Sequence, residues 1–82
     1  MIPDINKRYK CDILYIRQCQ DISQKQLAES LDIPRYKLSY LENGHYLPTV
    51  ELLDKIKKEL GCLVSDLYSL EIQKVIMKNH KE

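Results

Sequence analysis

The fold is decided by residues 23–44, which read S-Q-K-Q-L-A-E-S-L-D-I-P-R-Y-K-L-S-Y-L-E-N-G. Ser23 and Gln26 have the spacing of a capping box, in which two residues satisfy each other's backbone N–H groups at a helix start. The apolar residues that follow share one helix face: Leu27, Ala28 and Leu31. Residues 32–34 then read Asp-Ile-Pro, and a proline disfavours helical geometry in the residue before it. The stretch therefore predicts two short helices joined by a tight turn.

The second of these helices is expected over residues 34–43. Leu38 and Leu41 are its inward residues, and Gly44 is placed to end it in a left-handed conformation. The polar and aromatic residues share the opposite face, with Lys37 on its border: Arg35, Tyr36, Ser39, Tyr40 and Asn43. Arginine can bond guanine through two hydrogen bonds, and the other side chains can bond phosphates or base edges. From periodicity alone, a major-groove reader and an ordinary solvated face remain equally open.

Several motifs in the chain occur together at fixed spacing. They are S-Q-x-x-L-A from Ser23, L-E-N-G over residues 41–44, L-P-T over residues 47–49, and Leu60-Gly61 before Asp66-Leu67. In this combination the chain resembles the lambda-repressor/Cro family, also called Xre-type regulators, over roughly residues 9 to 70. Several anchors at fixed spacing are more specific than one short motif.

The resemblance implies an all-α domain of about five helices that acts as a sequence-specific regulator, a repressor, on double-stranded DNA. In that family the glutamine that opens the first of the two helices bonds a phosphate, and so does the asparagine of E-N-G. The base readers lie at the start of the second helix and one or two turns later. Carried over to this chain, the DNA-binding residues are Gln24, Arg35, Tyr36, Lys37, Ser39, Tyr40, Asn43 and His45. Two alternatives stay open, because the two tyrosines could pair with each other and E-N-G could be only a helix terminus.

Composition limits the other function classes. The 82 residues suit one small domain, and 13 basic against 12 acidic residues leave a net charge of +1, so any electropositive surface must be local. Three cysteines without a C-x-x-C pair, and no signal peptide, indicate packing residues in a reducing cytoplasm. No apolar run is long enough to span a membrane.

An enzyme is not expected, and neither is a cofactor or a metal. The chain has no G-x-S-x-G elbow, no glycine-rich phosphate loop and no metal-ligand cluster. The alternative function is a protein-interaction module of the same fold, such as an antitoxin or a partner-binding regulator, which the resemblance also allows. The near-zero net charge and the apolar cluster from Ile72 to Met77 favour that alternative.

The segments around the two central helices complete the domain. The spacing of Tyr9, Ile13 and Ile16 predicts a helix over residues 6–20, with Arg17 among its outward residues. Further helices are expected from the Thr49 N-cap to Gly61, and from about Val64.

We expect residues 1–70 to form the DNA-binding domain and residues 71–82 a tail. The tail could extend a helix, form a strand or cover a partner. A homodimer is expected, because one recognition helix reads too few base pairs for a unique site. The candidate pairing surface is apolar: Leu63, Leu70, Ile72, Val75, Ile76 and Met77. Otherwise the tail covers the first helix, around Ile2, Ile5 or Leu14.

Overall fold

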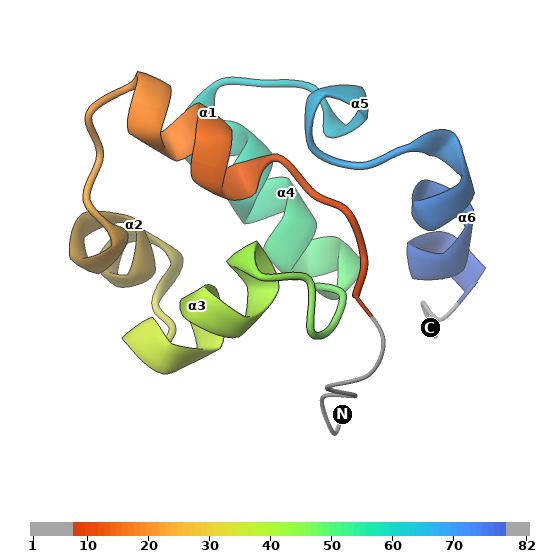
Figure 1. Ribbon diagram of the computed structural model, residues 1–82, viewed down its shortest axis with the longest axis horizontal. Helices are drawn as coiled ribbons and strands as arrows, with labels where there is room; N and C mark the ends of the chain where they lie inside the picture. The colour runs from red at the N-terminus through yellow and green to blue at the C-terminus, as the bar shows by residue number, and fades with distance from the viewer. Residues whose placement is uncertain (1–7, 79–82) are drawn as a thin grey trace.

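The structure is a computed structural model that describes residues 8–78. Within this range every regular element is an α-helix, which confirms the predicted all-α fold (Figure 1). The sixth helix lies in the tail, for which the sequence leaves a helix, a strand and a partner-covering segment open. In chain order the elements are α1 (Ile13–Cys19), α2 (Gln24–Leu31), α3 (Arg35–Glu42), α4 (Val50–Leu60), α5 (Val64–Leu67) and α6 (Leu70–Lys78).

The first helix is shorter than its sequence pattern predicts. The pattern favours residues 6–20, of which the first two lie outside the described range, yet α1 begins only at Ile13. The preceding segment, residues 8–12, runs beside distant parts of the chain. The Tyr9 N–H, for example, donates to the Gly44 carbonyl at 2.8 Å. The Asp12 N–H, which lies well inside the predicted helix, donates to the Leu67 carbonyl at 3.1 Å and not to a residue one helical turn before it, so the predicted start is wrong.

The two central helices begin and end close to where their local signals predict. Ser23 Oγ accepts from the Gln26 N–H at 3.0 Å, and Gln26 Oε1 accepts from the Ser23 N–H at 2.8 Å, so the capping box is complete. Asp32 ends α2 in the left-handed region, with φ at 58°. Pro34 is the extended N-cap of α3, and Asn43 is its C-cap. The predicted range of 34–43 therefore agrees with α3 together with its two caps.

α4 forms the long side of the core. Thr49 Oγ1 accepts from the Leu52 N–H at 3.1 Å, as expected of an N-cap, and Gly61 ends the helix at a φ of 62°. At 11 residues α4 is the longest helix in the described range, where no helix is both long and apolar enough to cross a membrane.

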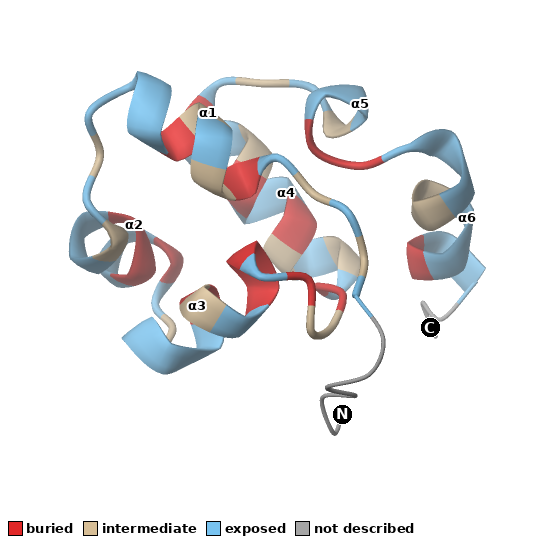
Figure 2. Cartoon of the chain, in the orientation of Figure 1, coloured by how far each residue is buried: buried red, intermediate tan, exposed pale blue. Residues whose placement is uncertain are grey.

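One apolar cluster holds the molecule together, and every helix contributes to it (Figure 2). The inward residues predicted for α2 and α3 are buried, and of those predicted for α4, Leu53, Ile56 and Leu60 are buried whereas Val50 is half-buried. The sequence pattern also leaves out of the core the buried hydrophobic residues Leu47, Tyr68 and Ile76. The fully buried side chains are Ile13, Leu27, Leu31, Leu38, Leu41, Ile56 and Leu67.

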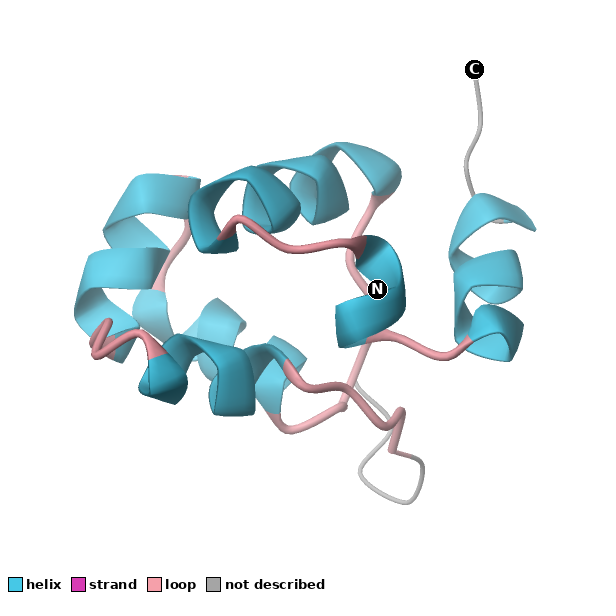
Figure 3. Cartoon of the chain, turned by 90° about the horizontal axis from the view of Figure 1, so that it is seen from above, coloured by secondary structure: helices cyan, strands magenta, loops and turns pink. Residues whose placement is uncertain are grey.

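The C-terminal end is a separate helix and not an extension of α5. Extended backbone at Tyr68 ends α5, and the Ile72 N–H donates to Ser69 Oγ at 3.3 Å in the first turn of α6. Ile76 is 3% exposed and joins the core cluster, whereas Leu70 is 65% exposed. α6 lies at the opposite end of the long axis from α2 (Figures 1 and 3). Its apolar residues therefore point in two directions, into the core and away from it.

Candidate nucleic-acid interface

The outer face of α3 carries the side chains that the helical wheel assigns to it. Leu38 and Leu41 are fully buried and fix which side of the helix faces outward. Tyr36 and Tyr40 are 67% and 42% exposed on that outward side. Of the other residues predicted there, Ser39 is half-buried and the rest are exposed: Arg35, Lys37 and Asn43.

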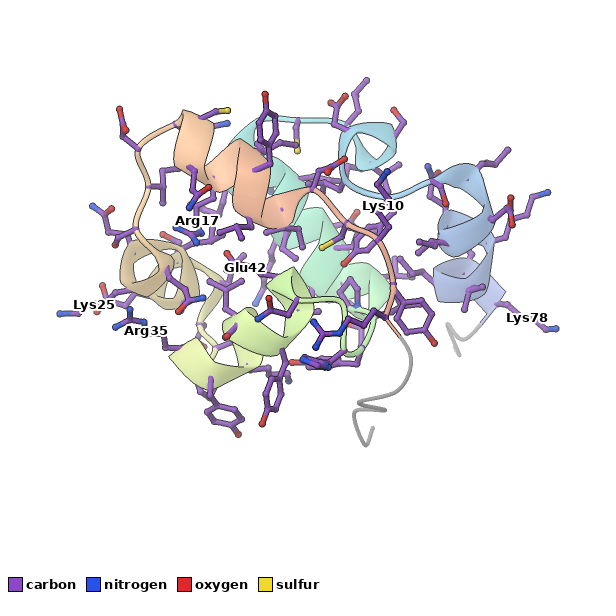
Figure 4. All side chains as sticks on the ribbon, viewed as in Figure 1. Lys10, Arg17, Lys25, Arg35, Glu42 and Lys78 are labelled. Atoms are coloured by element: carbon purple, nitrogen blue, oxygen red, sulfur yellow. The ribbon has the colours of Figure 1, made fainter. Side chains whose placement is uncertain are left out.

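A buried ion pair ties the end of α3 to α1. Arg17 Nε donates to Glu42 Oε2 at 2.6 Å, and Arg17 Nη2 donates to Glu42 Oε1 at 3.2 Å. The two side chains are only 10% and 3% exposed, and they lie between α1, α2 and α3 (Figure 4). Arg17 Nη1 also donates to the Ile22 carbonyl at 2.9 Å. Each of the three guanidinium nitrogens thus donates a hydrogen bond inside the protein.

The burial of Arg17 contradicts its predicted outward position. Its partner carboxylate lies 25 residues further along the chain, so no local pattern reveals the pairing. A weaker signal was present, because Arg17 follows the inward Ile13 by four residues and such residues share a helix face. The sequence pattern therefore did not identify Arg17 and Glu42 as residues that hold the candidate site in place.

Gln24 connects this ion pair to the start of α3. Gln24 Nε2 donates to Glu42 Oε1 at 2.9 Å, and Gln24 Oε1 accepts from Arg35 Nε at 3.1 Å. Gln24 is half-buried, whereas Arg35 is exposed at the outer end of the helix pair (Figure 4). Two of the predicted DNA-binding residues are thereby brought together as the first residues of α2 and α3.

The two tyrosines of α3 pair edge to face, as one of the open alternatives proposes. Their ring centroids lie 6.1 Å apart, and Tyr40 also makes edge contacts with His45 at 5.5 Å and Tyr46 at 6.4 Å. Tyr46 Oη donates to the Lys37 carbonyl at 3.0 Å. Burial, and secondly the phenol of Tyr36, raise the pKa of Tyr46 to about 12. Because Tyr36 and Tyr40 stay exposed, this pairing leaves their outer edges open to a ligand.

Asn43 and His45 follow at the far end of α3. Asn43 Nδ2 donates to the Ser39 carbonyl at 2.9 Å, and the Asn43 carbonyl accepts from Arg8 Nη1 at 3.4 Å. The His45 side chain is half-buried, and its Nδ1 has no hydrogen-bond partner within the part of the chain that the structure describes. Asn43 therefore acts as a helix terminus in the free protein, while its side chain remains exposed.

The cysteines differ from one another in their surroundings. Cys11 is half-buried, its Sγ donates to the Leu41 carbonyl at 3.3 Å, and burial raises its pKa. Burial also raises the pKa of Cys62. Cys19 is exposed, so the expected packing role does not apply to it. A raised pKa disfavours the reactive thiolate, and no cluster of metal-binding side chains occurs among the described residues.

Comparisons with known proteins agree with this geometry. The chain matches a helix-turn-helix family model over residues 13–67. It is 31% identical over 62 residues to an uncharacterised HTH-type transcriptional regulator of Methanocaldococcus jannaschii, covering 76% of this chain and 94% of that relative. The clp gene regulator ClgR from C. glutamicum has a similar structure, with a TM-score of 0.61 and 30% identity over 66% of this chain and 70% of that one. A hypothetical transcription factor, NHTF, from Neisseria shares the fold with a TM-score of 0.62 at 21% identity, over 79% of this chain and 75% of that one.

Proposed function

Because this chain belongs to the lambda-repressor-like (Xre-type) helix-turn-helix family of DNA-binding transcriptional regulators, we propose that α3 enters the major groove and reads base edges there. The observation that carries this proposal is the outer face of α3, where Arg35, Tyr36 and Tyr40 are exposed while Leu38 and Leu41 are buried. A helix that presents such side chains from a rigid support suits the width of the major groove.

Each candidate residue has a role that follows from its chemistry. Arg35 stands at the start of α3 and donates to guanine, while Tyr36 and Tyr40 contact thymine methyl groups or the sugar–phosphate backbone. Gln24, at the start of α2, and Asn43, at the end of α3, bond phosphates. The remaining polar residues contribute to the same surface: Lys37, Ser39 and His45.

The charge distribution supports binding through a local surface. The net charge of +1 gives no general attraction to DNA. Lys25 and Arg35, however, project from the same end of the molecule (Figure 4). The nearby Glu42 carboxylate is buried and paired with Arg17, so it adds little negative field there. The regulator we propose is a cytoplasmic repressor without catalytic activity or cofactor, which excludes other proteins from the DNA it covers.

Arg35→Ala tests the recognition face. We expect a loss of ~1–3 kcal/mol on the best sequence and a relaxed preference at one base position. The measurement is selection from random duplexes followed by fluorescence anisotropy at fixed salt, since affinity depends on salt. Asn43→Ala is the matched control, and it should weaken all sequences alike. Unchanged affinity and preference after Arg35→Ala would show that another face reads the DNA.

We also propose that the protein pairs as a homodimer through its C-terminal end, with residues 1–70 binding DNA and residues 71–82 contributing to pairing. Leu70 and Met77 are seven residues apart on the outward side of α6, where they are 65% and 59% exposed. An exposed apolar stripe of this kind marks an interface. A two-fold pair would place half-sites about one helical turn apart, ~34 Å.

The pairing is tested with point variants, because Ile76 belongs to the buried cluster and a truncation would remove it. Leu70→Glu together with Met77→Glu should convert a sedimenting dimer into a monomer that still folds. Lys74→Glu, on the same helix, serves as the control for added negative charge. A wild-type protein that sediments as a monomer at tens of micromolar, free and on DNA, would refute the dimer.

A further inference from the structure

A half-open groove lies between α3 and the start of α4. It has a volume of about 540 Å³, which is within the range of small-molecule sites. Its base is apolar, because Ile33, Leu47 and Leu52 line it. Leu47 is buried, whereas Ile33 and Leu52 are only half-buried, so apolar surface remains accessible there. A ligand with an apolar body would cover that surface.

Three tyrosine rings line one side of the groove. Tyr36 and Tyr46 both contact Tyr40, with ring centroids 6.1 and 6.4 Å away and ring planes at 80° and 83°. Tyr46 is held in place, since its hydroxyl donates to the Lys37 carbonyl at 3.0 Å. Aromatic rings prefer such edge-to-face contacts, and one more flat ring would extend the cluster in the same geometry. The tyrosines therefore favour an aromatic ligand over an aliphatic one.

Charged side chains of both signs line the groove in equal number. The two carboxylates and two ammonium groups belong to Asp32, Glu51, Lys37 and Lys55. Within residues 8–78 none of the four takes part in an ion pair. A ligand with a single charge would meet two like charges here, whereas a zwitterion can place each of its charges beside an opposite one. The lining is thus complementary to a ligand with one charge of each sign.

Glu51 and Lys55 present such a pair of charges on one helix face. They are four residues apart on α4, and both are exposed. Residues at this spacing have Cβ atoms about 5–6 Å apart. The ammonium and the carboxylate of an α-amino acid are bonded to one carbon atom, so the two groups can meet Glu51 and Lys55 at the same time. The side chain of such a ligand then extends across the groove to the tyrosines.

We propose that this groove binds a free aromatic amino acid, with Glu51 bonding its ammonium, Lys55 its carboxylate and the tyrosines its ring. Tyr36 and Tyr40 also belong to the face of α3 that we assign to DNA. A ligand that engages these rings withdraws them from the major groove, so the amino acid should lower the affinity for DNA. This last step rests on the proposed function, whereas binding of the amino acid to the free protein does not.

Calorimetric titration of the intact chain with L-tryptophan, in the absence of DNA, tests the site. We expect a dissociation constant of about 0.5 mM for a ligand of this size. Tryptamine lacks the carboxylate and indole-3-propionate lacks the ammonium. Each should bind roughly tenfold more weakly, because each loses a charge-assisted hydrogen bond. Equal affinity of either analogue, or no binding of L-tryptophan at several millimolar, would overturn the proposal.

Two variants that remove one charge each test the contacts to the head group. Lys55→Met should weaken binding of L-tryptophan but not of tryptamine, and Glu51→Gln should weaken L-tryptophan but not indole-3-propionate. Lys58→Met, at an exposed lysine of α4 outside the groove, is the matched control and should change no titration. Equal losses for all three ligands would contradict the two contacts, since they would then reflect net charge or folding.

The effect on DNA is measured separately, by fluorescence anisotropy on the duplex that the protein prefers. Saturating L-tryptophan should raise the dissociation constant at least about fivefold. Glycine at the same concentration has both charges but no ring, and it should have no effect. Unchanged DNA affinity with L-tryptophan bound would overturn the regulatory step. A protein that binds L-tryptophan but no duplex would disprove the proposed function and leave the amino-acid site intact.

Discussion

The α2–α3 unit and the α5–α6 segment are both pairs of short helices, yet they are held in different ways. In the first, the capping box of α2 is complete, and Gln24 bonds both Glu42 and Arg35. In the second, Leu63 has no side-chain acceptor to cap α5, so only Asp66 contributes, by accepting from the Leu63 N–H at 2.9 Å. Side-chain hydrogen bonds join α2 to α3 across 11 and 18 residues of sequence, whereas those of α5 and α6 among the described residues join positions no more than five residues apart.

The two regions also differ in the kind of side chain that they expose to solvent. Outside α2–α3, polar and aromatic side chains face solvent over a fully buried leucine layer. Outside α5–α6, Leu63, Leu70 and Met77 are each more than half exposed, at 66%, 65% and 59%. Binding through the α2–α3 unit, as we propose, would require accurately placed side chains, and such placement benefits from hydrogen bonds inside the unit. A segment that leaves apolar area uncovered is better suited to meeting another protein surface.

The largest effect should come from breaking the polar fixation of the first region. Glu42→Ala leaves the Arg17 guanidinium buried and unpaired, so the free energy of unfolding should fall by ~3–5 kcal/mol. Urea unfolding followed by circular dichroism measures it. Glu71→Ala, at an exposed glutamate of α6, is the control and should stay within ~0.5 kcal/mol. A loss below about 1 kcal/mol for Glu42→Ala would mean that the pair is not buried.

Matched leucine truncations compare the apolar side chains of the two regions. Leu38→Ala removes a side chain that is 0% exposed and should destabilise by ~2–5 kcal/mol through the cavity it leaves. Leu70→Ala removes one that is 65% exposed, and for the monomer it should cost less than ~0.5 kcal/mol. Both are measured by denaturant unfolding at low protein concentration. Equal losses would contradict the assigned burial.

A smaller effect is expected at the α2 cap. Ser23→Ala removes the oxygen that accepts from the Gln26 N–H, and the free energy of unfolding should drop by ~0.5–2 kcal/mol. Ser30→Ala, at an exposed position inside the same helix, separates this loss from the general effect of replacing serine. If the two variants unfold at the same urea concentration, the cap contributes nothing.

The smallest effect should be a gain in the second region. Leu63 has the extended N-cap geometry of α5, and Asp66 already provides half of a capping box. Leu63→Ser should complete the box and raise the free energy of unfolding by ~0.5 kcal/mol. Leu63→Ala lacks the new acceptor and controls for removal of the exposed leucine. A thermal melt in which both variants behave alike would argue against the missing cap.

The parts of the fold that sequence predicts well are those with local signals. The capping box at Ser23, the proline before α3 and the glycine after α4 each act within a few residues. The start of α1 has no such signal, since the Asp12 N–H is bonded to the Leu67 carbonyl at 3.1 Å, far along the chain. Prediction from local sequence therefore fails where a backbone group or a charged side chain bonds to a residue far along the chain.

The same distinction applies to the candidate site. Periodicity is enough to place Arg35, Tyr36 and Tyr40 on one exposed face of α3. It does not reveal that Gln24 holds Arg35, because that contact depends on how α2 crosses α3. It also misses the buried Arg17 beneath them. The DNA-binding roles of all these residues remain predictions for the experiments above.

Gly44 lies where residues 8–12 cross the end of α3. Gly44 is buried and has a φ of 77°, which residues with a side chain rarely adopt. A Cβ at this position would also overlap the Tyr9 carbonyl. At this crossing the Tyr9 N–H is bonded to the Gly44 carbonyl, so its hydrogen–deuterium exchange requires the crossing to open. The Tyr9 amide is therefore a natural, label-free reporter of whether this crossing at the end of α3 is closed, in the free protein and on DNA.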